Sequence, residues 1–250
     1  MKIILLIFFL LLSFSFANDR ELEAIFKKSN INGTLVLSSL DNKENYIYNT
    51  KRALTQYIPA STFKIPNTLI ALQEQVIKDE YETIKWDGVV RTYKPWNENQ
   101  NLQTAIAVSC VWCYEKFAQK IGKENYLEYL QKIDYGNHKV GDVVSKFWLE
   151  GDIKISAVQQ IEFLQRLYKN QLPFEQKYID ITKKILIVEQ NENYTIRVKS
   201  GWSGTIGWYV GYIQKANTVW FFAFNGDINR EKLIYRKQIV MEALKIKGIL

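Results

Sequence analysis

The sequence predicts a mixed α+β fold: an antiparallel sheet formed by both chain ends and flanked by terminal helices, with an inserted all-helical subdomain. Apolar, β-prone runs lie near both ends of the 250-residue chain, whereas the stretch from Pro59 to about Lys169 is mainly helical in pattern. No internal repeat or low-complexity linker interrupts the chain. We therefore expect a single domain at 18–250, with an α/β part at about 18–58 and 176–250 and a helical part at about 59–175.

The first predicted elements are the strands Gly33–Ser39 and Asn45–Asn49, joined as a hairpin through Asp41-Asn42-Lys43. The helical stretch follows. Its first helix continues from the Ser61 region, with Pro66 near the first turn, where a missing backbone N–H is tolerated.

Two further helices are predicted at Val111–Ile121 and Ala157–Tyr168, which carry apolar residues at spacings of three and four. Strands then return, and a final amphipathic helix closes the chain. The predicted strands are Tyr194–Lys199, Ile206–Ile213 and Thr218–Asn225, and the final helix is Arg230–Lys247. A four-residue loop, Gln214-Lys215-Ala216-Asn217, joins the last two strands.

Residues 1–17 resemble a secretory signal peptide. Lys2 provides the basic start, Ile3–Leu12 the apolar run, and small residues at Ser15 and Ala17 suit signal peptidase. The apolar run is short for a membrane span, so an uncleaved anchor is the less favoured alternative. We expect an exported, periplasmic protein that begins at Asn18 and keeps no stable membrane anchor after cleavage.

The charge pattern argues against nucleic-acid binding. The net charge is +7, or +6 once Lys2 is removed, and the lysines are scattered rather than clustered. A lysine-rich solvated surface explains this excess, and an anionic small substrate would benefit from the positive field.

The inventory of ligands also argues against a metal site. The chain has one histidine, His138, and two cysteines, Cys110 and Cys113, which make no familiar zinc ligand set. A Ser-His-Asp triad would require His138, which stands in a polar, turn-like stretch and is expected to be solvated. If both cysteines are helical, their Cβ atoms lie about 5–6 Å apart, which exceeds disulfide geometry. We expect them to be buried packing residues, with a strained bridge as the alternative in an oxidising compartment.

Three short motifs in order carry the chemistry. The first, Ser61-Thr62-Phe63-Lys64, places a hydroxyl and an amine one helical turn apart, so that the amine can activate the serine if it acts as a base. Ser109-Cys110-Val111 and Lys199-Ser200-Gly201 follow it. This set is typical of serine β-lactamases and penicillin-binding proteins. The motifs are expected to meet at the seam between the sheet and the helical block, with the third on an edge strand.

The chain resembles the class D β-lactamases, or oxacillinases, across essentially all of its mature length, and the resemblance implies the β-lactamase/transpeptidase-like fold. Valine at 111, where penicillin-binding proteins and class A enzymes usually have asparagine, points to class D, as does Tyr135-Gly136-Asn137. The other matching stretches are the three motifs, Phe147-Trp148-Leu149-Glu150-Gly151, Ile206-Gly207-Trp208-Tyr209-Val210-Gly211-Tyr212 and Val219-Trp220-Phe221-Phe222-Ala223.

The resemblance implies that this chain hydrolyses β-lactams through an acyl-enzyme on Ser61. In the family the buried lysine, here Lys64, is N-carboxylated by carbon dioxide and serves as general base, and the indole N–H of Trp148 donates to the carbamate. No other cofactor is implied. Without the resemblance, core packing is the favoured explanation for Trp148. A helix N-cap role for Ser61 is compatible with its role as nucleophile.

The remaining site residues are also implied by the resemblance. Ser109 relays a proton to the departing lactam nitrogen, and Lys199 supplies positive charge. Backbone N–H groups of Ser61 and Trp202 form the oxyanion hole. The implied substrate-binding residues are Val111, Ser200, Gly201, Trp202 and Arg236. For Lys199 the alternative is an exposed strand lysine, and for Arg236 a surface arginine.

Two other functions remain open. A penicillin-binding carboxypeptidase would share Ser61, Lys64 and Lys199 but is expected to have asparagine at 111. A β-lactam sensor would be acylated and turn over slowly. Ser200 stands where many relatives have threonine, and the short segment Trp202-Ser203-Gly204-Thr205 leaves the preferred β-lactam open. The protein is expected to be a monomer or a homodimer.

Overall fold

The computed structural model describes residues 19–250, so the predicted signal peptide and its cleavage site lie outside the described residues. A six-stranded antiparallel sheet forms the centre of the molecule, in the order β2-β1-β6-β5-β4-β3. Its strands are β1 (Gly33–Ser39), β2 (Asn45–Tyr48), β3 (Ile187–Gln190), β4 (Thr195–Trp202), β5 (Ile206–Gln214) and β6 (Val219–Asp227). Strands from both chain ends therefore share one sheet, and the predicted fold class is confirmed.

The register shows how the two chain ends combine. Val36 of β1 pairs with Ala223 of β6, and Lys199 of β4 pairs with Val210 of β5. The predicted hairpin is confirmed, but β2 ends at Tyr48. Asn49 adopts a left-handed conformation (φ 55°) and its side chain accepts a hydrogen bond from the Arg52 N–H at the start of α2.

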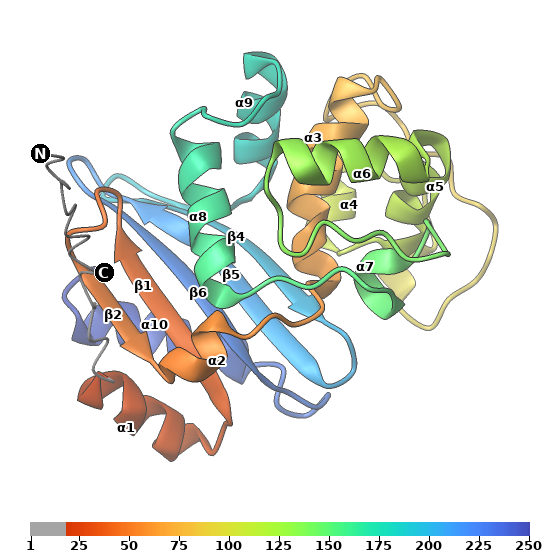
Figure 1. Cartoon of the computed structure of the whole chain (residues 1–250). Helices are drawn as coiled ribbons and strands as arrows, with labels where there is room; N and C mark the ends of the chain where they lie inside the picture. The colour runs from red at the N-terminus through yellow and green to blue at the C-terminus, as the bar shows by residue number, and fades with distance from the viewer. Residues whose placement is uncertain (1–18) are drawn as a thin grey trace, which may run out of the picture.

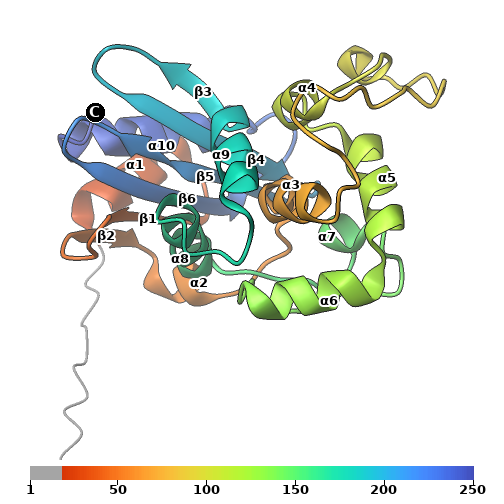
Figure 2. The ribbon, with the colours of Figure 1, turned by 90° about the horizontal axis from the view of Figure 1, so that it is seen from above.

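Helices lie on both faces of the sheet (Figure 1). The terminal helices α1 and α10 pack together on one face, and α8 covers the other. Figure 2 shows the helices α3 to α7 gathered beside the sheet. The helices are α1 (Arg20–Ser29), α2 (Thr50–Leu54), α3 (Lys64–Gln73), α4 (Leu102–Ala107), α5 (Val111–Ile121), α6 (Lys123–Lys132), α7 (Phe147–Glu150), α8 (Ala157–Tyr168), α9 (Gln176–Ile185) and α10 (Tyr235–Ile246), with 3-10 turns η1 (Ala60–Phe63) and η2 (Lys94–Trp96).

Local sequence explains the helix boundaries. The side chain of Asp19 caps α1 by accepting hydrogen bonds from the Glu21 and Leu22 N–H groups. Acidic residues in the first turn of α1 and basic residues in its last turn interact favourably with the helix dipole. A capping box at Ser156 starts α8. The helices α5 and α8 have the predicted bounds, and α10 begins later than predicted.

The interior consists of two apolar clusters, one on each face of the sheet. The larger fills the space between the sheet and the helical block, and includes Phe63, Trp148 and Trp208. The smaller lies between the sheet and the terminal helices, and includes Phe26 and Phe224. Within residues 19–250, none of the helices has both the length and the apolar character that crossing a membrane requires.

Candidate active site

The first motif lies where the sheet meets the helical block. Ser61 is in η1 and Lys64 begins α3, and the Lys64 Nζ donates a hydrogen bond of 3.1 Å to the Ser61 Oγ. Ser61 is 7% exposed and Lys64 is fully buried. Because neither η1 nor α3 has a side-chain cap, the structure does not assign Ser61 the alternative role of N-cap. The predicted hydroxyl–amine pair is therefore formed.

Burial controls the charge of Lys64. It lowers the pKa of the Lys64 amine well below its usual value, and the nearby positive charge of Lys199 lowers it further. The opposing field of Glu115 only partly offsets these effects. The ammonium form would also contact the Tyr114 ring, whose centroid lies 5.1 Å from Nζ. The neutral amine is favoured, and that form can accept a proton.

Trp148 packs against the residue that precedes this lysine. Its ring stacks on Phe63 at 5.8 Å between centroids and meets Phe147 edge-on at 5.3 Å. Trp148 is fully buried, yet its indole Nε1 has no hydrogen-bond partner within residues 19–250. Packing accounts for the ring but not for the N–H group, because buried indole N–H groups usually find an acceptor.

The second and third motifs are joined by a direct contact. The Lys199 Nζ donates to the Ser109 Oγ and also, at 3.0 Å, to the Ser200 carbonyl oxygen. Lys199 is only 4% exposed, which excludes the alternative of an exposed strand lysine. Burial, with a smaller contribution from Arg236, lowers the pKa of Lys199 to about 7.

The third motif occupies a section of β4 that pairs with β5 but not with β3. Contrary to expectation, β4 is not the edge strand, because β3 lies outside it. The pairing with β3 involves only Thr195, Ile196 and Arg197, however, so Lys199–Gly201 extends beyond it. A Cβ atom added at Gly201 would lie 3.0 Å from the Pro59 carbonyl oxygen and 3.2 Å from the Ser61 nitrogen. Glycine therefore lets β4 approach the nucleophile closely.

Arg236 reaches the same strand from the second residue of α10. Its Nη1 donates to the Gly201 carbonyl oxygen at 2.6 Å, and its Nε donates to the Leu233 carbonyl oxygen at 2.9 Å. Burial lowers the pKa of this guanidinium, although arginine stays charged at any ordinary pH. A cavity of about 290 Å³ adjoins it, lined by Ser200, Tyr209, Leu233, Ile234, Arg236 and Lys237.

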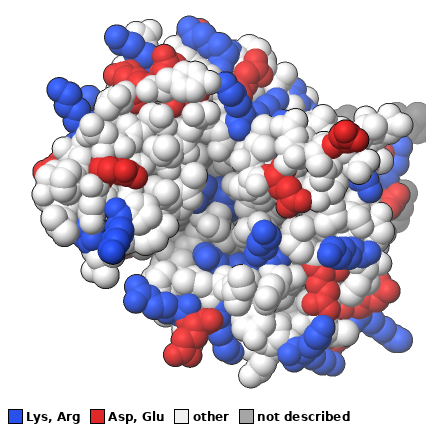
Figure 3. Space-filling view, turned by 180° about the vertical axis from the view of Figure 1, so that it is seen from behind, with Lys and Arg blue, Asp and Glu red and all other residues white. Residues whose placement is uncertain are grey.

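The two other predicted substrate-binding residues, Val111 and Trp202, lie at the start of α5 and at the end of β4. Val111 is the first residue of α5 and is half-buried. Trp202 ends β4, and its indole Nε1 donates to the Ile228 carbonyl oxygen at 2.7 Å. Figure 3 shows a hollow near the centre of one face of the molecule, with basic side chains inside it. Such a surface suits an anionic ligand.

His138 lies where the sequence predicts, on the solvated surface of the protein. Residues 19–250 contain no group of three or more His, Cys, Asp or Glu side chains that could hold a metal ion. The His138 Nε2 pairs with Asp134 Oδ1 at 2.8 Å on the protein surface rather than with Ser61. A Ser-His-Asp triad is not formed.

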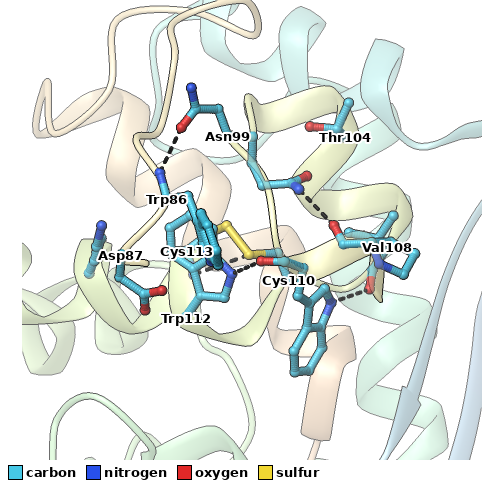
Figure 4. The surroundings of a disulfide bond; sticks show 12 residues. Trp86, Asp87, Asn99, Thr104, Val108, Cys110, Trp112 and Cys113 are labelled. Atoms are coloured by element: carbon cyan, nitrogen blue, oxygen red, sulfur yellow. Dashed lines mark hydrogen bonds between the residues drawn. A yellow bond between two sulfur atoms is a disulfide. The ribbon is translucent and has the colours of Figure 1, made fainter. Parts of the chain in front are cut away.

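The cysteines are buried, as predicted, but the favoured prediction that they are not bridged is wrong, and the alternative of a bridge is the one observed. Cys110 and Cys113 form a disulfide, with Cα atoms 5.5 Å apart (Figure 4). The distance argument assumed that both residues are helical, but Cys110 is the N-cap of α5 and its backbone (φ −52°, ψ 108°) is not helical. Cys110 lies in the connection between α4 and α5, and the sequence alone carries no signal for its conformation.

Sequence reasoning also missed the polar groups that surround the motifs. Tyr114 shares a hydrogen bond of 2.8 Å with the Thr68 hydroxyl in the turn that follows Lys64. Gln160 donates at 2.9 Å to Thr62 Oγ1, which itself donates to the Pro59 carbonyl oxygen. These contacts brace η1 and α3. The Tyr114–Thr68 and Gln160–Thr62 pairs are 46 and 98 residues apart in sequence, so no local pattern predicts them.

Comparisons with known proteins agree with this geometry. Residues 27–245 match the family model of the penicillin binding protein transpeptidase domain. The chain is 40% identical over 237 residues to β-lactamase OXA-48 of Klebsiella pneumoniae, covering 93% of this chain and 89% of that protein. It is 40% identical over 233 residues to β-lactamase OXA-10 of Pseudomonas aeruginosa, covering 90% and 88%.

A solved structure extends the agreement to three dimensions. FUS-1 (OXA-85), a class D β-lactamase from Fusobacterium nucleatum subsp. polymorphum, superposes with a TM-score of 0.90 at 36% identity, covering 94% of this chain and 100% of that one. The chain belongs to the class D β-lactamase family. As a class D family member it is a serine enzyme, and the contact between Ser61 and Lys64 is the feature of its own structure that fits this membership best.

Proposed function

We propose that this protein hydrolyses the amide bond of penicillin-type β-lactams through an acyl-enzyme on Ser61. The observation that carries the proposal is the buried Lys64 amine, 3.1 Å from the Ser61 Oγ and with a strongly lowered pKa. A neutral amine at this distance accepts the serine proton, which makes a weak nucleophile effective. Membership of the class D family supports the choice of substrate.

In acylation, each of the three motifs has a separate role. Ser61 Oγ attacks the lactam carbonyl carbon and its proton passes to the Lys64 side chain, while the lactam C–N bond breaks. The departing nitrogen takes a proton from the Ser109 hydroxyl, which is replenished from Lys199 through their hydrogen bond. Backbone N–H groups of Ser61 and Trp202 stabilise the developing oxyanion. In deacylation, water attacks the ester and Ser61 regains its proton.

We also propose that Lys64 is N-carboxylated by carbon dioxide, as the resemblance implies. Two features of the chain fit the modification: a lysine held neutral by burial, and a fully buried indole N–H on Trp148 that lacks an acceptor. When bound, the carboxyl group supplies an oxygen base for acylation and deacylation. Trp148 would donate to it, which accounts for the otherwise unpaired N–H.

Substrate binding relies on positive charge beside β4. A β-lactam carries a carboxylate next to its reactive ring. Ser200 and Arg236 line a cavity of about 290 Å³, and Lys199 precedes Ser200 in β4. Because Arg236 already donates to the Gly201 carbonyl oxygen, its fork is held near the strand. A fixed guanidinium suits carboxylate recognition.

Mass spectrometry of the intact protein tests the proposal. Wild-type protein quenched in acid during reaction with a penicillin should gain the mass of one penicillin, and peptide mapping should locate it on Ser61. The Ser61→Ala variant should remain unmodified. An adduct elsewhere, or none in the wild type, would disprove the acyl-enzyme.

We further propose export to the periplasm, cleavage after Ala17 and, as the consequence of hydrolysis there, resistance of the host to β-lactams. The apolar run and small residues of the first 17 positions support this. N-terminal sequencing of protein from the periplasmic fraction should begin at Asn18. Accumulation of full-length protein in the membrane fraction would contradict cleavage.

A further inference from the structure

Ser109 occupies an unusual backbone conformation. It lies in the short connection between α4 and α5, and its φ of 53° is in the left-handed region that residues other than glycine rarely adopt. Strained residues of this kind persist only where their surroundings hold them. The Ser109 hydroxyl meets Lys199 in this conformation, so the connection must be kept in place for the contact to form.

The next residue begins α5 with a poor cap. Cys110 is the N-cap, and its Sγ accepts from the Cys113 N–H at 3.3 Å. Ser, Thr, Asp and Asn are the residues that usually cap helices, because their oxygen atoms accept this bond well. Here the Cys110–Cys113 disulfide links the N-cap covalently to the first turn of the helix, directly after Ser109 (Figure 4).

Hydrogen bonds hold the same connection from its other side. The Cys110 N–H donates to the Ala105 carbonyl oxygen at 2.8 Å, and the Trp96 Nε1 donates to the Val108 carbonyl oxygen at 2.9 Å. Trp112, between the two cysteines, donates in turn to the Trp96 carbonyl oxygen at 3.0 Å. Ser109 is thus enclosed between a hydrogen-bonded segment and a covalently closed helix start.

Burial decides what kind of disulfide this is. Both cysteines have no exposed surface. A redox-sensing cysteine is usually solvent-accessible, whereas a shielded bridge in an exported protein is structural. We infer that the Cys110–Cys113 disulfide is a positioning device for Ser109, which replaces a helix cap and holds the Ser109 hydroxyl against Lys199. The inference rests on the proposed function, because it assigns the disulfide a part in the proton relay.

Two double variants distinguish the effect of the disulfide from the effect of the helix cap. Cys110→Ala/Cys113→Ala removes both, whereas Cys110→Ser/Cys113→Ala removes the bridge but restores a capping oxygen. We expect kcat/KM for nitrocefin, per folded molecule, to fall roughly 10-fold to 100-fold in the first variant, since small misplacements of reacting groups cost that much. The second variant should recover part of the loss. Circular dichroism measures the folded fraction, and the second variant also serves if the first does not fold.

A double-mutant cycle identifies the residue through which the disulfide acts. In a Ser109→Ala background, removal of both cysteines should change kcat/KM by less than about two-fold, because the group being positioned is already gone. Equal losses in both backgrounds would overturn the inference, as would a folded Cys110→Ala/Cys113→Ala variant with wild-type kcat/KM. Both outcomes leave the proposed function intact. Absence of hydrolysis by the wild type would overturn the proposed function and this inference together.

Discussion

A lysine inside a protein core is stable only as the neutral amine, and Lys64 illustrates the cost of that arrangement. Its pKa is lowered well below 10.5 by burial and then by Lys199. Between the lowered pKa of the folded state and pH 10.5, the unfolded chain therefore binds a proton at this position that the folded protein does not bind. By linkage, this residue makes folding less favourable at neutral pH, and the stability of the protein rises as the pH rises toward 10.5. Chemistry is gained at the expense of stability.

Replacing Lys64 with methionine should make the folded protein more stable and remove its activity. In carbon-dioxide-depleted buffer near pH 7, we expect Lys64→Met to raise the free energy of unfolding by about 1–2 kcal/mol and to abolish turnover. The advantage should shrink as the pH approaches 10.5, where the unfolded lysine also loses its proton. Urea unfolding at several pH values measures it, with the exposed Lys120→Met as control. A variant less stable than the wild type at every pH would refute the argument.

Trp148 can be tested through its N–H group alone. Trp148→Phe should keep a ring stacked on Phe63 but remove the donor proposed for the carboxylated lysine. We expect the bicarbonate concentration for half-maximal activity to rise roughly 10-fold, the value of about one hydrogen bond to a charged group. Titration of activity with bicarbonate measures the change, and the partly exposed Trp220→Phe is the control. An unchanged bicarbonate requirement would leave Trp148 as a packing residue.

Among the elements, β4 is the one that joins substrate site and nucleophile. Its last residues run past the end of β3 and against η1, and Gly201 marks the closest approach. An alanine there would bring a Cβ to 3.0 Å from the Pro59 carbonyl oxygen and 3.2 Å from the Ser61 nitrogen. Contacts this tight require η1 or β4 to shift.

The Gly201→Ala variant should therefore lose activity out of proportion to stability. We expect kcat/KM to fall roughly 10-fold to 100-fold from displacement of the Ser61 backbone, with a loss of about 1–3 kcal/mol in the free energy of unfolding. The buried Gly141 is a matched control, because a Cβ there would have its nearest neighbour at 3.6 Å. Wild-type kinetics in Gly201→Ala would show that the close approach is unimportant.

Local patterns predicted part of these elements. The periodicity of Val111–Ile121 and Ala157–Tyr168 marks both helices at their observed bounds, and motif order brought Ser61, Lys64 and Lys199 into one site. The helix α9 has a comparable pattern, with buried Tyr178, Ile179, Thr182 and Ile185, and is a helix additional to those predicted. The short edge strand β3 has mostly exposed residues and no such pattern.

Other features were beyond sequence reasoning because distant residues create them. The Cys110 backbone departs from helical geometry in the connection between α4 and α5, so the spacing of the cysteines does not indicate their separation. The unpaired indole N–H of Trp148 is apparent only once the surrounding core is assembled. The proximity of Arg236 to Gly201 spans 35 residues and came from the family resemblance, not from any local pattern.

At the scale of the whole molecule, the two chain ends close the fold. The Lys247 Nζ pairs with Asp19 at 2.7 Å, and their side chains are 9% and 15% exposed. Burial by itself would raise the pKa of Asp19, but hydrogen bonds from Lys247 and from the Leu22 and Glu21 N–H groups outweigh it and hold that pKa below 3.8. The pair thus connects the cap of α1 to the end of α10.

Breaking this pair should affect stability and leave chemistry alone. We expect Lys247→Met to lower the free energy of unfolding by about 1–3 kcal/mol at neutral pH, with kcat unchanged. Because the Asp19 pKa is depressed, its contribution is present above pH 3.8 and disappears as the pH falls through its folded value. Urea unfolding at a series of pH values from 7 downward measures this against exposed Lys245→Met. A difference that persists in acid would contradict the assignment.

The most direct test of the whole account is the number of nitrocefin molecules that one protein molecule hydrolyses, measured with bicarbonate and in carbon-dioxide-depleted buffer. The account predicts sustained turnover with bicarbonate and a much slower reaction without it, since Lys64 supplies the base for both acylation and deacylation. A single stoichiometric burst in both buffers would contradict it and indicate a sensor or a penicillin-binding protein. Sustained turnover at the same rate in both buffers would contradict carboxylation of Lys64.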